Sequence, residues 1–371
     1  MYSTVGRAVD AGRVPIAPRQ PGRPTSRSTW GPAETRALEA CLAEAIPDLE
    51  LPLASERGFL REPFEGSSWY AQDVVTVLVP GRADRRILLK DFGTHVGDKG
   101  GMAIRREREL RIYRDLLDHS LLETPHYVGS VWEPEHERFW LLIEFIDGAD
   151  LRSYGFEHYV HACAWLGKMH GYFHRRLDEL KGATFLARFD GRLFRSEVEI
   201  ATRNAGLFSR GLARRLTTAL DGHEDLAEAM TEQASTLVHG GFLPQGVMVQ
   251  ARSSGVRIAT VDWELAGVGP GLFDLALMTD GFDPPRLARL WDAYEHEASA
   301  WGFPVPHRED LTYLIDCFRL QRRVAFLSRS RKRGYSEEAV AKLVGEVEEL
   351  RASVLPARSG VAYGSGGGNV R

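Results

Sequence analysis

Hydrophobic periodicity changes abruptly part-way along this chain. Before residue 147, short apolar runs rich in β-branched residues alternate with turns, and one amphipathic helical stretch separates the second run from the third. After Asp150, apolar residues recur at helical spacing over most of the remaining sequence. The order strand, strand, helix, strand, strand, followed by many helices, predicts an α+β fold with a small β-rich lobe and a larger helical lobe.

The same patterns predict the individual elements. The predicted strands cover residues 69–79, 87–92, 127–132 and 139–146, and a short helix is expected to begin at Pro32. Later helices are predicted near residues 190–204, 208–236, 284–300, 309–329 and 336–353, with one embedded hairpin at 246–250 and 256–261. The chain is accordingly divided into a disordered basic arm (1–30), an N-terminal lobe (31–148), a helical C-terminal lobe (149–355) and a flexible tail (356–371).

The composition is typical of a soluble globular protein, with 43% hydrophobic and 26% charged residues among 371. A net charge of −4 gives no reason to expect a nucleic-acid partner, and no apolar run is long enough to cross a membrane. The N-terminus lacks the apolar segment of a secretory signal. Cys41, Cys163 and Cys317 lie far apart in apolar helical patterns, which favours buried thiols over disulfides or a metal site. We therefore expect a cytoplasmic protein.

Two segments of the helical region carry the most specific chemistry. His239-Gly240 is followed, after a short strand-like run, by Asp262-Trp263-Glu264, which comes directly after the apolar residues 258–261. A carboxylate at the end of a strand beside a cleft is a natural ligand for Mg²⁺. A second acidic residue, Asp274, begins the sequence Asp-Leu-Ala a little further along.

Together these segments resemble the catalytic and metal-binding loops of the aminoglycoside phosphotransferase and choline kinase-like family, which has a two-lobed protein-kinase-like fold. The resemblance covers roughly residues 60–300. It implies that ATP and Mg²⁺ bind between the lobes, with the N-terminal lobe binding the nucleotide. It also implies that Asp262 is a metal ligand, and that His239 and Asp274 support the catalytic loop without acting as the base.

The catalytic loop departs from the family's pattern, which usually reads His-Gly-Asp, four variable residues, then Asn. Gly241 stands at the position of the base and Gly246 at the position of a metal ligand. Glycine supplies neither a carboxylate nor an amide, and a positioned general base contributes about 10²–10⁴-fold to a rate.

Two functions therefore remain open. One is an ATP-dependent O-phosphotransferase with a non-standard active site, acting on a hydroxyl of a small molecule or of a peptide, such as Ser or Thr in a natural-product precursor. The other is a catalytically inactive pseudokinase that serves as a scaffold for a peptide or a partner enzyme.

Lys90 ends an apolar strand-like run, from which a lysine can project into a cleft and pair with the phosphates of ATP. A lysine that only reaches solvent from an edge strand is the alternative. The resemblance implies that a Glu on the following helix pairs with Lys90; Glu109 is assigned, and Glu107 is the alternative. Asp91-Phe92-Gly93 looks like a kinase metal motif but precedes the catalytic loop, so we interpret it as a chance tripeptide.

Weaker signals mark the rest of the expected nucleotide site. Ser67 and Ser68 lie ahead of the first predicted strand, where hydroxyls and backbone N–H groups can surround a phosphate, although an ordinary turn fits equally well. Glu144 and Ile146 end the fourth predicted strand. At this place the resemblance implies backbone hydrogen bonds to adenine.

Basic residues gather near the C-terminal end of the helical region. A solvated helix end, which the helix dipole favours, is one interpretation. The other is a groove for an acidic peptide, a phosphate or a partner protein, which argues against a polycationic aminoglycoside as substrate. The residues are Arg319, Arg322, Arg323, Arg329, Arg331, Lys332 and Arg333.

Overall fold

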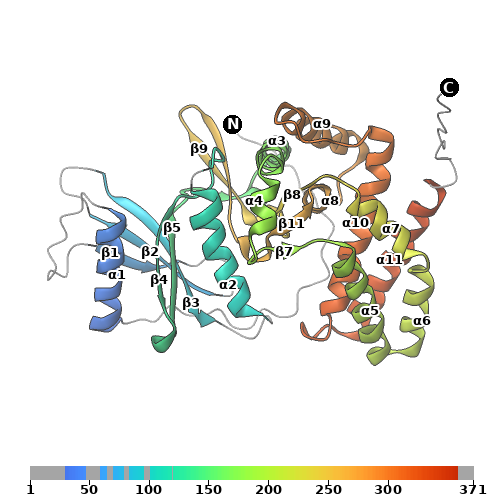
Figure 1. The fold of residues 1–371 in the computed structure, drawn as a ribbon, viewed down its shortest axis with the longest axis horizontal. Coiled ribbons are helices and arrows are strands. Elements are labelled where there is room, and N and C mark those ends of the chain that lie inside the picture. Colours follow the sequence, from blue (N-terminus) through green and yellow to red (C-terminus); the bar gives the residue numbers. More distant parts are fainter. Residues whose placement is uncertain are drawn as a thin grey trace, which may run out of the picture.

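The computed structural model describes residues 30–46, 59–64, 70–78, 83–95, 101–118 and 120–357. A β-rich part lies at one end of the molecule and a helical part makes up the rest (Figure 1). Within the helical part, short strands and the helices α3, α4 and α8 lie toward the β-rich part, and α6 and α11 lie at the far end. The predicted arm and tail fall almost entirely outside the described residues. No described helix is both long enough and apolar enough to cross a membrane.

The β-rich part is one antiparallel sheet in the order β1-β2-β3-β5-β4. Strand β5, between β3 and β4, is buried on both faces, which explains its unbroken apolar sequence. Trp140 and Leu142 pack toward α1, while Leu141 and Ile143 join the core that contains α2. The strands are β1 (Phe59–Pro63), β2 (Tyr70–Val77), β3 (Arg85–His95), β4 (Tyr127–Glu133) and β5 (Arg138–Glu144).

Two helices cover this sheet. The helix predicted from Pro32 is α1 (Pro32–Ala45), and α2 (Met102–Arg111) continues into a π-helical turn, Ile112–Leu117. The strand β1 was not predicted, because its exposed, mixed sequence Phe-Leu-Arg-Glu-Pro has no buried face to reveal it.

The helical part contains nine helices within the described residues. The prediction of a single helix over 208–236 is wrong. Ser209 has an extended backbone, ends α5 and caps α6 through its Oγ. Gly222, at a φ of 68°, separates α6 from α7, and the segment ends in a strand. The helices are α3 (Phe156–His174), α4 (Leu177–Gly182), α5 (Gly191–Phe208), α6 (Arg210–Ala219), α7 (His223–Thr231), α8 (Leu272–Met278), α9 (Pro284–Ala300), α10 (Arg308–Arg329) and α11 (Glu337–Ala357).

Two three-stranded sheets bring the motif-bearing loops together. One has the order β10-β9-β6, in which the predicted hairpin is confirmed, and the other has the order β7-β11-β8. Strand β8 leads directly to His239, and β10 leads to Asp262. The strands are β6 (Ala149–Asp150), β7 (Ala187–Arg188), β8 (Ser235–Val238), β9 (Val247–Arg252), β10 (Gly255–Thr260) and β11 (Gly267–Pro270).

The larger hydrophobic core runs from the inner face of the sheet through α3 to α10 and α11. The two glycines of α3 permit close packing, since a Cβ at Gly167 would lie 2.3 Å from the carbonyl oxygen of Tyr294 on α9. Cys41, Cys163 and Cys317 are buried and free, as expected.

Candidate active site

A lysine and two carboxylates meet where the β-rich part faces the helical part. The Nζ of Lys90, on β3, lies 2.9 and 3.0 Å from the two carboxylate oxygens of Glu109 on α2. The same Nζ lies 2.7 Å from Oδ1 of Asp262, which follows β10. Glu107, the alternative partner, points elsewhere and lies 3.8 Å from Arg111. The structure therefore pairs Lys90 with Glu109.

Burial and charge set the ionisation of this cluster. Lys90 is 4% exposed and Glu109 is 1% exposed. Burial opposes the charge on Lys90, but Asp262 and Glu109 outweigh it and hold the pKa of Lys90 well above its ordinary value. Burial raises the pKa of Glu109 to about 7, although the Lys90 ammonium pulls it the other way. Lys90 is thus held as a cation.

Asp262 differs from its two neighbours in exposure and backbone conformation. Its side chain is 51% exposed, whereas those of Lys90 and Glu109 are buried. Its φ of 66° lies in the left-handed region, which a non-glycine residue adopts only at a cost. Residues strained in this way cluster at functional sites, so the strain at Asp262 points to a functional position for its carboxylate.

The loop after β8 is held by a buried carboxylate. Asp274, on α8 and 0% exposed, accepts hydrogen bonds from the backbone N–H of His239 at 2.6 Å and of Gly240 at 3.0 Å. The Nε2 of His239 lies 3.0 Å from the carbonyl oxygen of Val261, which ties this loop to the residue before Asp262. The structure thus brings together the two residues expected to support the loop.

The three glycines of the loop differ in what their positions allow. Gly240 has a φ of 76°, and a Cβ there would lie 2.5 Å from the carbonyl oxygen of Leu265. A Cβ at Gly241 would meet its nearest neighbour, Leu265 Cδ1, at 3.6 Å, and one at Gly246 would meet the Val261 oxygen at 3.5 Å. These are ordinary contacts. The backbone requires glycine at 240, but not at 241 or 246.

The family model described as the phosphotransferase enzyme family (APH) matches residues 72–310, well over half of the chain. The chain belongs to this family. Among curated proteins, none matches it.

Solved structures share the fold of this chain. A macrolide 2′-phosphotransferase from Brachybacterium faecium is 17% identical, with a TM-score of 0.54, over 82% of this chain and 98% of that one. A choline/ethanolamine kinase family protein from Mesorhizobium loti is 18% identical, with a TM-score of 0.53, over 88% and 98%. An aminoglycoside phosphotransferase from Alicyclobacillus acidocaldarius is 13% identical, with a TM-score of 0.51, over 82% and 93%. Identities this low show the fold alone, and the expected α+β protein-kinase-like fold is confirmed.

In this family member, α2 is bound directly to the loop that carries Asp262. Nη1 of Arg108 donates to the carbonyl oxygen of Glu264 at 2.8 Å, and its Nε donates to that of Phe185 at 2.9 Å. Arg105 lies 3.4 Å from the Glu264 carboxylate. These contacts, which were not predicted from the sequence, hold Glu109 beside Lys90. The only sequence signal for them is the arginine-rich character of the helix.

The end of β5 is also engaged with the helical part. The Glu144 carboxylate accepts from Nη1 and Nη2 of Arg257, on β10, at 2.6 and 2.8 Å. Burial alone would raise the pKa of Glu144, but the Arg257 hydrogen bonds and charge hold it below its ordinary value. The buried Arg257 also donates to the carbonyl oxygens of Glu123 and Thr124. The Glu144 side chain therefore links the two parts, and the backbone role predicted for Glu144 and Ile146 stays a prediction.

Two further predictions concern the serines expected near phosphate and the Asp91-Phe92-Gly93 tripeptide. Ser67 and Ser68 lie outside the described residues. Asp91 accepts hydrogen bonds from the Gly93 N–H at 2.9 Å and the Thr94 hydroxyl at 2.7 Å, so its carboxylate stabilises the strand locally. Phe92 is buried in the sheet. This placement agrees with the interpretation of Asp91-Phe92-Gly93 as a chance tripeptide.

Most of the predicted basic cluster is internally paired. Arg323 lies 2.9 Å from Asp280 and 2.8 Å from Glu346, and Arg329 lies 3.2 Å from Glu197. Arg319 and Arg322 also have carboxylate neighbours. These four arginines brace the helices, so they form neither a solvated helix end nor an open basic groove. Residues 331–333, after α10, are exposed.

Proposed function

We propose that this chain binds ATP with Mg²⁺ between its two parts and transfers a phosphoryl group to a hydroxyl, in an active site that lacks the family's usual base. The observation that carries the proposal is the Lys90 ammonium held between Glu109 and Asp262. A fixed cation beside a partly exposed carboxylate suits the phosphates of a nucleotide and the metal bound to them.

The residues present fit such a ligand. Glu109 orients Lys90 toward phosphate oxygens, and Asp262 offers oxygen ligands to a hard divalent cation. Mg²⁺ bound with the nucleotide would neutralise charge that develops on the phosphates. Asp274 and His239 would keep the loop in place beside the acceptor.

As the acceptor oxygen bonds to the γ-phosphorus and ADP leaves, the proton of the acceptor hydroxyl would pass to the transferred phosphate or to water, because position 241 offers no carboxylate. A loose transition state for phosphoryl transfer reduces the need for an early base, so the reaction would be slow but not forbidden. The similar structures named as a macrolide 2′-phosphotransferase and as a choline/ethanolamine kinase family protein support a hydroxyl compound as acceptor. A small molecule or a Ser or Thr of a peptide fits this proposal.

A second candidate is a pseudokinase that binds a peptide or a partner enzyme. The observation that favours it is that neither Gly241 nor Gly246 is required by the loop backbone, so functional groups are missing where they would fit. Under this alternative, the Lys90 cluster would serve nucleotide binding or stability only.

Calorimetric titration of ATP into the full chain, with and without Mg²⁺, tests the first proposal. We expect Mg²⁺ to strengthen binding, and Asp262→Ala to remove that enhancement. Asp91→Ala is the matched control, because its carboxylate belongs to the chance tripeptide and should leave binding unchanged. Absence of binding at millimolar ATP would exclude phosphoryl transfer by the isolated chain and leave the scaffold.

A further inference from the structure

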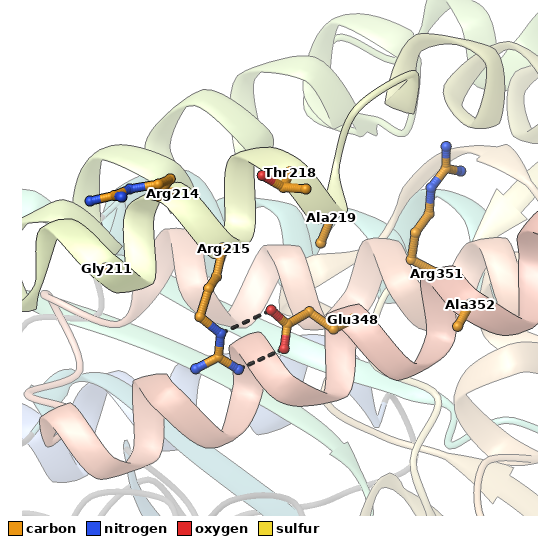
Figure 2. A pocket seen from close by; sticks show the side chains of 8 residues that line it. All are labelled: Gly211, Arg214, Arg215, Thr218, Ala219, Glu348, Arg351 and Ala352. Atoms are coloured by element: carbon orange, nitrogen blue, oxygen red, sulfur yellow. Dashed lines mark hydrogen bonds and ion pairs between the residues drawn. The ribbon is translucent and has the colours of Figure 1, made fainter.

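Helices α6 and α11 border a groove at the end of the helical part that is remote from the sheet (Figure 1). Its volume is about 570 Å³. Figure 2 shows Arg214, Arg215 and Ala219 on one side, and Glu348, Arg351 and Ala352 on the other. Three guanidinium groups and a single carboxylate therefore surround apolar walls made by small side chains.

The arginines of the groove differ in how strongly they are bound to other residues of the chain. Arg215 donates to both oxygens of Glu348 across the groove, at 2.9 and 2.6 Å. This pair is about half exposed, and exposed ion pairs contribute only about 0–1 kcal/mol, so another carboxylate can compete for Arg215. Arg351 uses one nitrogen to donate to the carbonyl oxygen of Asp221 at 2.7 Å. Arg214 is exposed, and no hydrogen-bond or ion-pair partner for it exists among the residues that the structure describes.

We propose that this groove docks an acidic peptide segment of another protein. Its carboxylates would bind Arg214 and Arg351 and displace Glu348 from Arg215, while small apolar side chains would pack on Ala219 and Ala352. A peptide fits better than a nucleic acid, because a peptide can place carboxylates at the arginines and small apolar side chains on Ala219 and Ala352. A phosphodiester backbone is charged at every unit, and the chain carries a net charge of −4.

Charge also excludes the chain's own ends as the occupant. The last fourteen residues, 358–371, contain no Asp or Glu, and the first 29 contain five Arg and a single acidic residue, Asp10. Neither segment complements three arginines. The occupant is therefore a separate acidic peptide, and the proposal holds whether or not the chain transfers phosphate.

Fluorescence anisotropy on the full chain tests this inference, with a labelled peptide of alternating Glu and Ala as probe and a Gln/Ala peptide as its neutral match. The double variant Arg214→Ala/Arg351→Ala should weaken binding of the acidic peptide on the order of tenfold. Glu348→Gln should strengthen it several-fold, because it frees Arg215 and removes a repulsive charge. Arg331→Ala, an exposed arginine outside the groove, should change nothing.

Equal binding of the neutral peptide, or wild-type affinity in the double variant, would overturn the proposal. So would a single-stranded oligonucleotide that binds more tightly than the peptide and loses affinity in the same double variant. Calorimetric ATP binding by that variant separates this test from the proposed function: unchanged ATP binding with lost peptide binding supports two distinct sites. If the double variant loses both ATP binding and peptide binding and its circular dichroism spectrum changes, the variant is misfolded. The test then rests on Glu348→Gln alone, and its failure to strengthen peptide binding would also overturn the proposal.

Discussion

The Lys90 cluster and the His239 loop are joined through the consecutive residues Asp262 and Val261, yet they differ in the functional side chains that they carry. Around Lys90, the charged side chains themselves are in place: a buried ion pair with Glu109 and a contact with the partly exposed Asp262. In the loop, Asp274 still fixes the backbone, but Gly241 and Gly246 offer no functional group. The comparison teaches that the backbone of this loop is held in place without the side chains that the family's pattern has at positions 241 and 246, because other residues hold the backbone.

The largest expected effect is a gain of activity from restoring the loop's side chains. Gly241→Asp combined with Gly246→Asn should raise the rate of phosphoryl transfer by about 10²–10⁴-fold, since a positioned base contributes that much. Both positions admit a Cβ at ordinary contact distances. The measurement is phosphate transfer from labelled ATP to a panel of hydroxyl compounds and Ser-containing peptides.

Gly241→Ala combined with Gly246→Ala is the matched control, because it fills the same space without a carboxylate or an amide. Equal activity in the two double variants would show that the added groups do not act as base and metal ligand. A restored variant that binds MgATP but transfers nothing would favour the pseudokinase.

The next effect concerns stability on the Lys90 side. Glu109→Ala should lower the free energy of unfolding by about 3–5 kcal/mol, because it removes the buried partner of a buried lysine and leaves only the partly exposed Asp262 beside it. Glu107→Ala, on the same helix, removes only an exposed contact with Arg111 and should cost less than about 1 kcal/mol. Urea denaturation of both variants provides the measurement. Similar losses in the two would contradict the assignment of Glu109 as the structural partner.

The sequence predicted the parts of this site that rest on period and spacing. The apolar run before Lys90, the amphipathic helix carrying Glu109, and the strand before Asp262 each have a recognisable pattern, and the structure places them together. The resemblance assigned Glu109 as the partner of Lys90, with Glu107 as the alternative, and the structure pairs Lys90 with Glu109. Helical periodicity alone could not separate the two, because both lie on one helix and only its rotation in the fold distinguishes them.

Contacts between distant segments could not be predicted in the same way. Arg257 is an isolated charge in the apolar run of β10, which hints at a buried partner but does not say that Glu144 is the partner. The pairing of the late arginines with Asp280 and Glu346 depends on how α10 and α11 pack. Spacing along one chain carries no information of this kind.

A smaller effect distinguishes neighbouring glycines within the loop. Gly240→Ala should destabilise the protein by about 2 kcal/mol or more, because a left-handed φ of 76° costs a non-glycine residue about 1–2 kcal/mol and the Cβ meets the Leu265 oxygen. Gly241→Ala, at a position without a positive φ, should change stability by less than about 1 kcal/mol. Thermal denaturation compares them, and equal destabilisation would contradict the view that only one glycine holds the loop's shape.

The smallest effect is a dependence of stability on pH that arises from buried histidines on the loop side of the site. Burial lowers the pKa of His239 and of His170, which lies 3.6 Å from Asp274, below the ordinary value of 6.5. Between the folded and unfolded pKa values the unfolded chain binds more protons, so the free energy of unfolding should fall as the pH drops below about 6.5. Urea denaturation between about pH 7.5 and pH 5 measures how steeply the free energy of unfolding depends on pH.

His239→Gln, which keeps a donor toward Val261 but does not titrate, should make this pH dependence less steep. A variant profile as steep as that of the wild type would place the acid sensitivity outside the loop and remove this distinction between the two sides of the site.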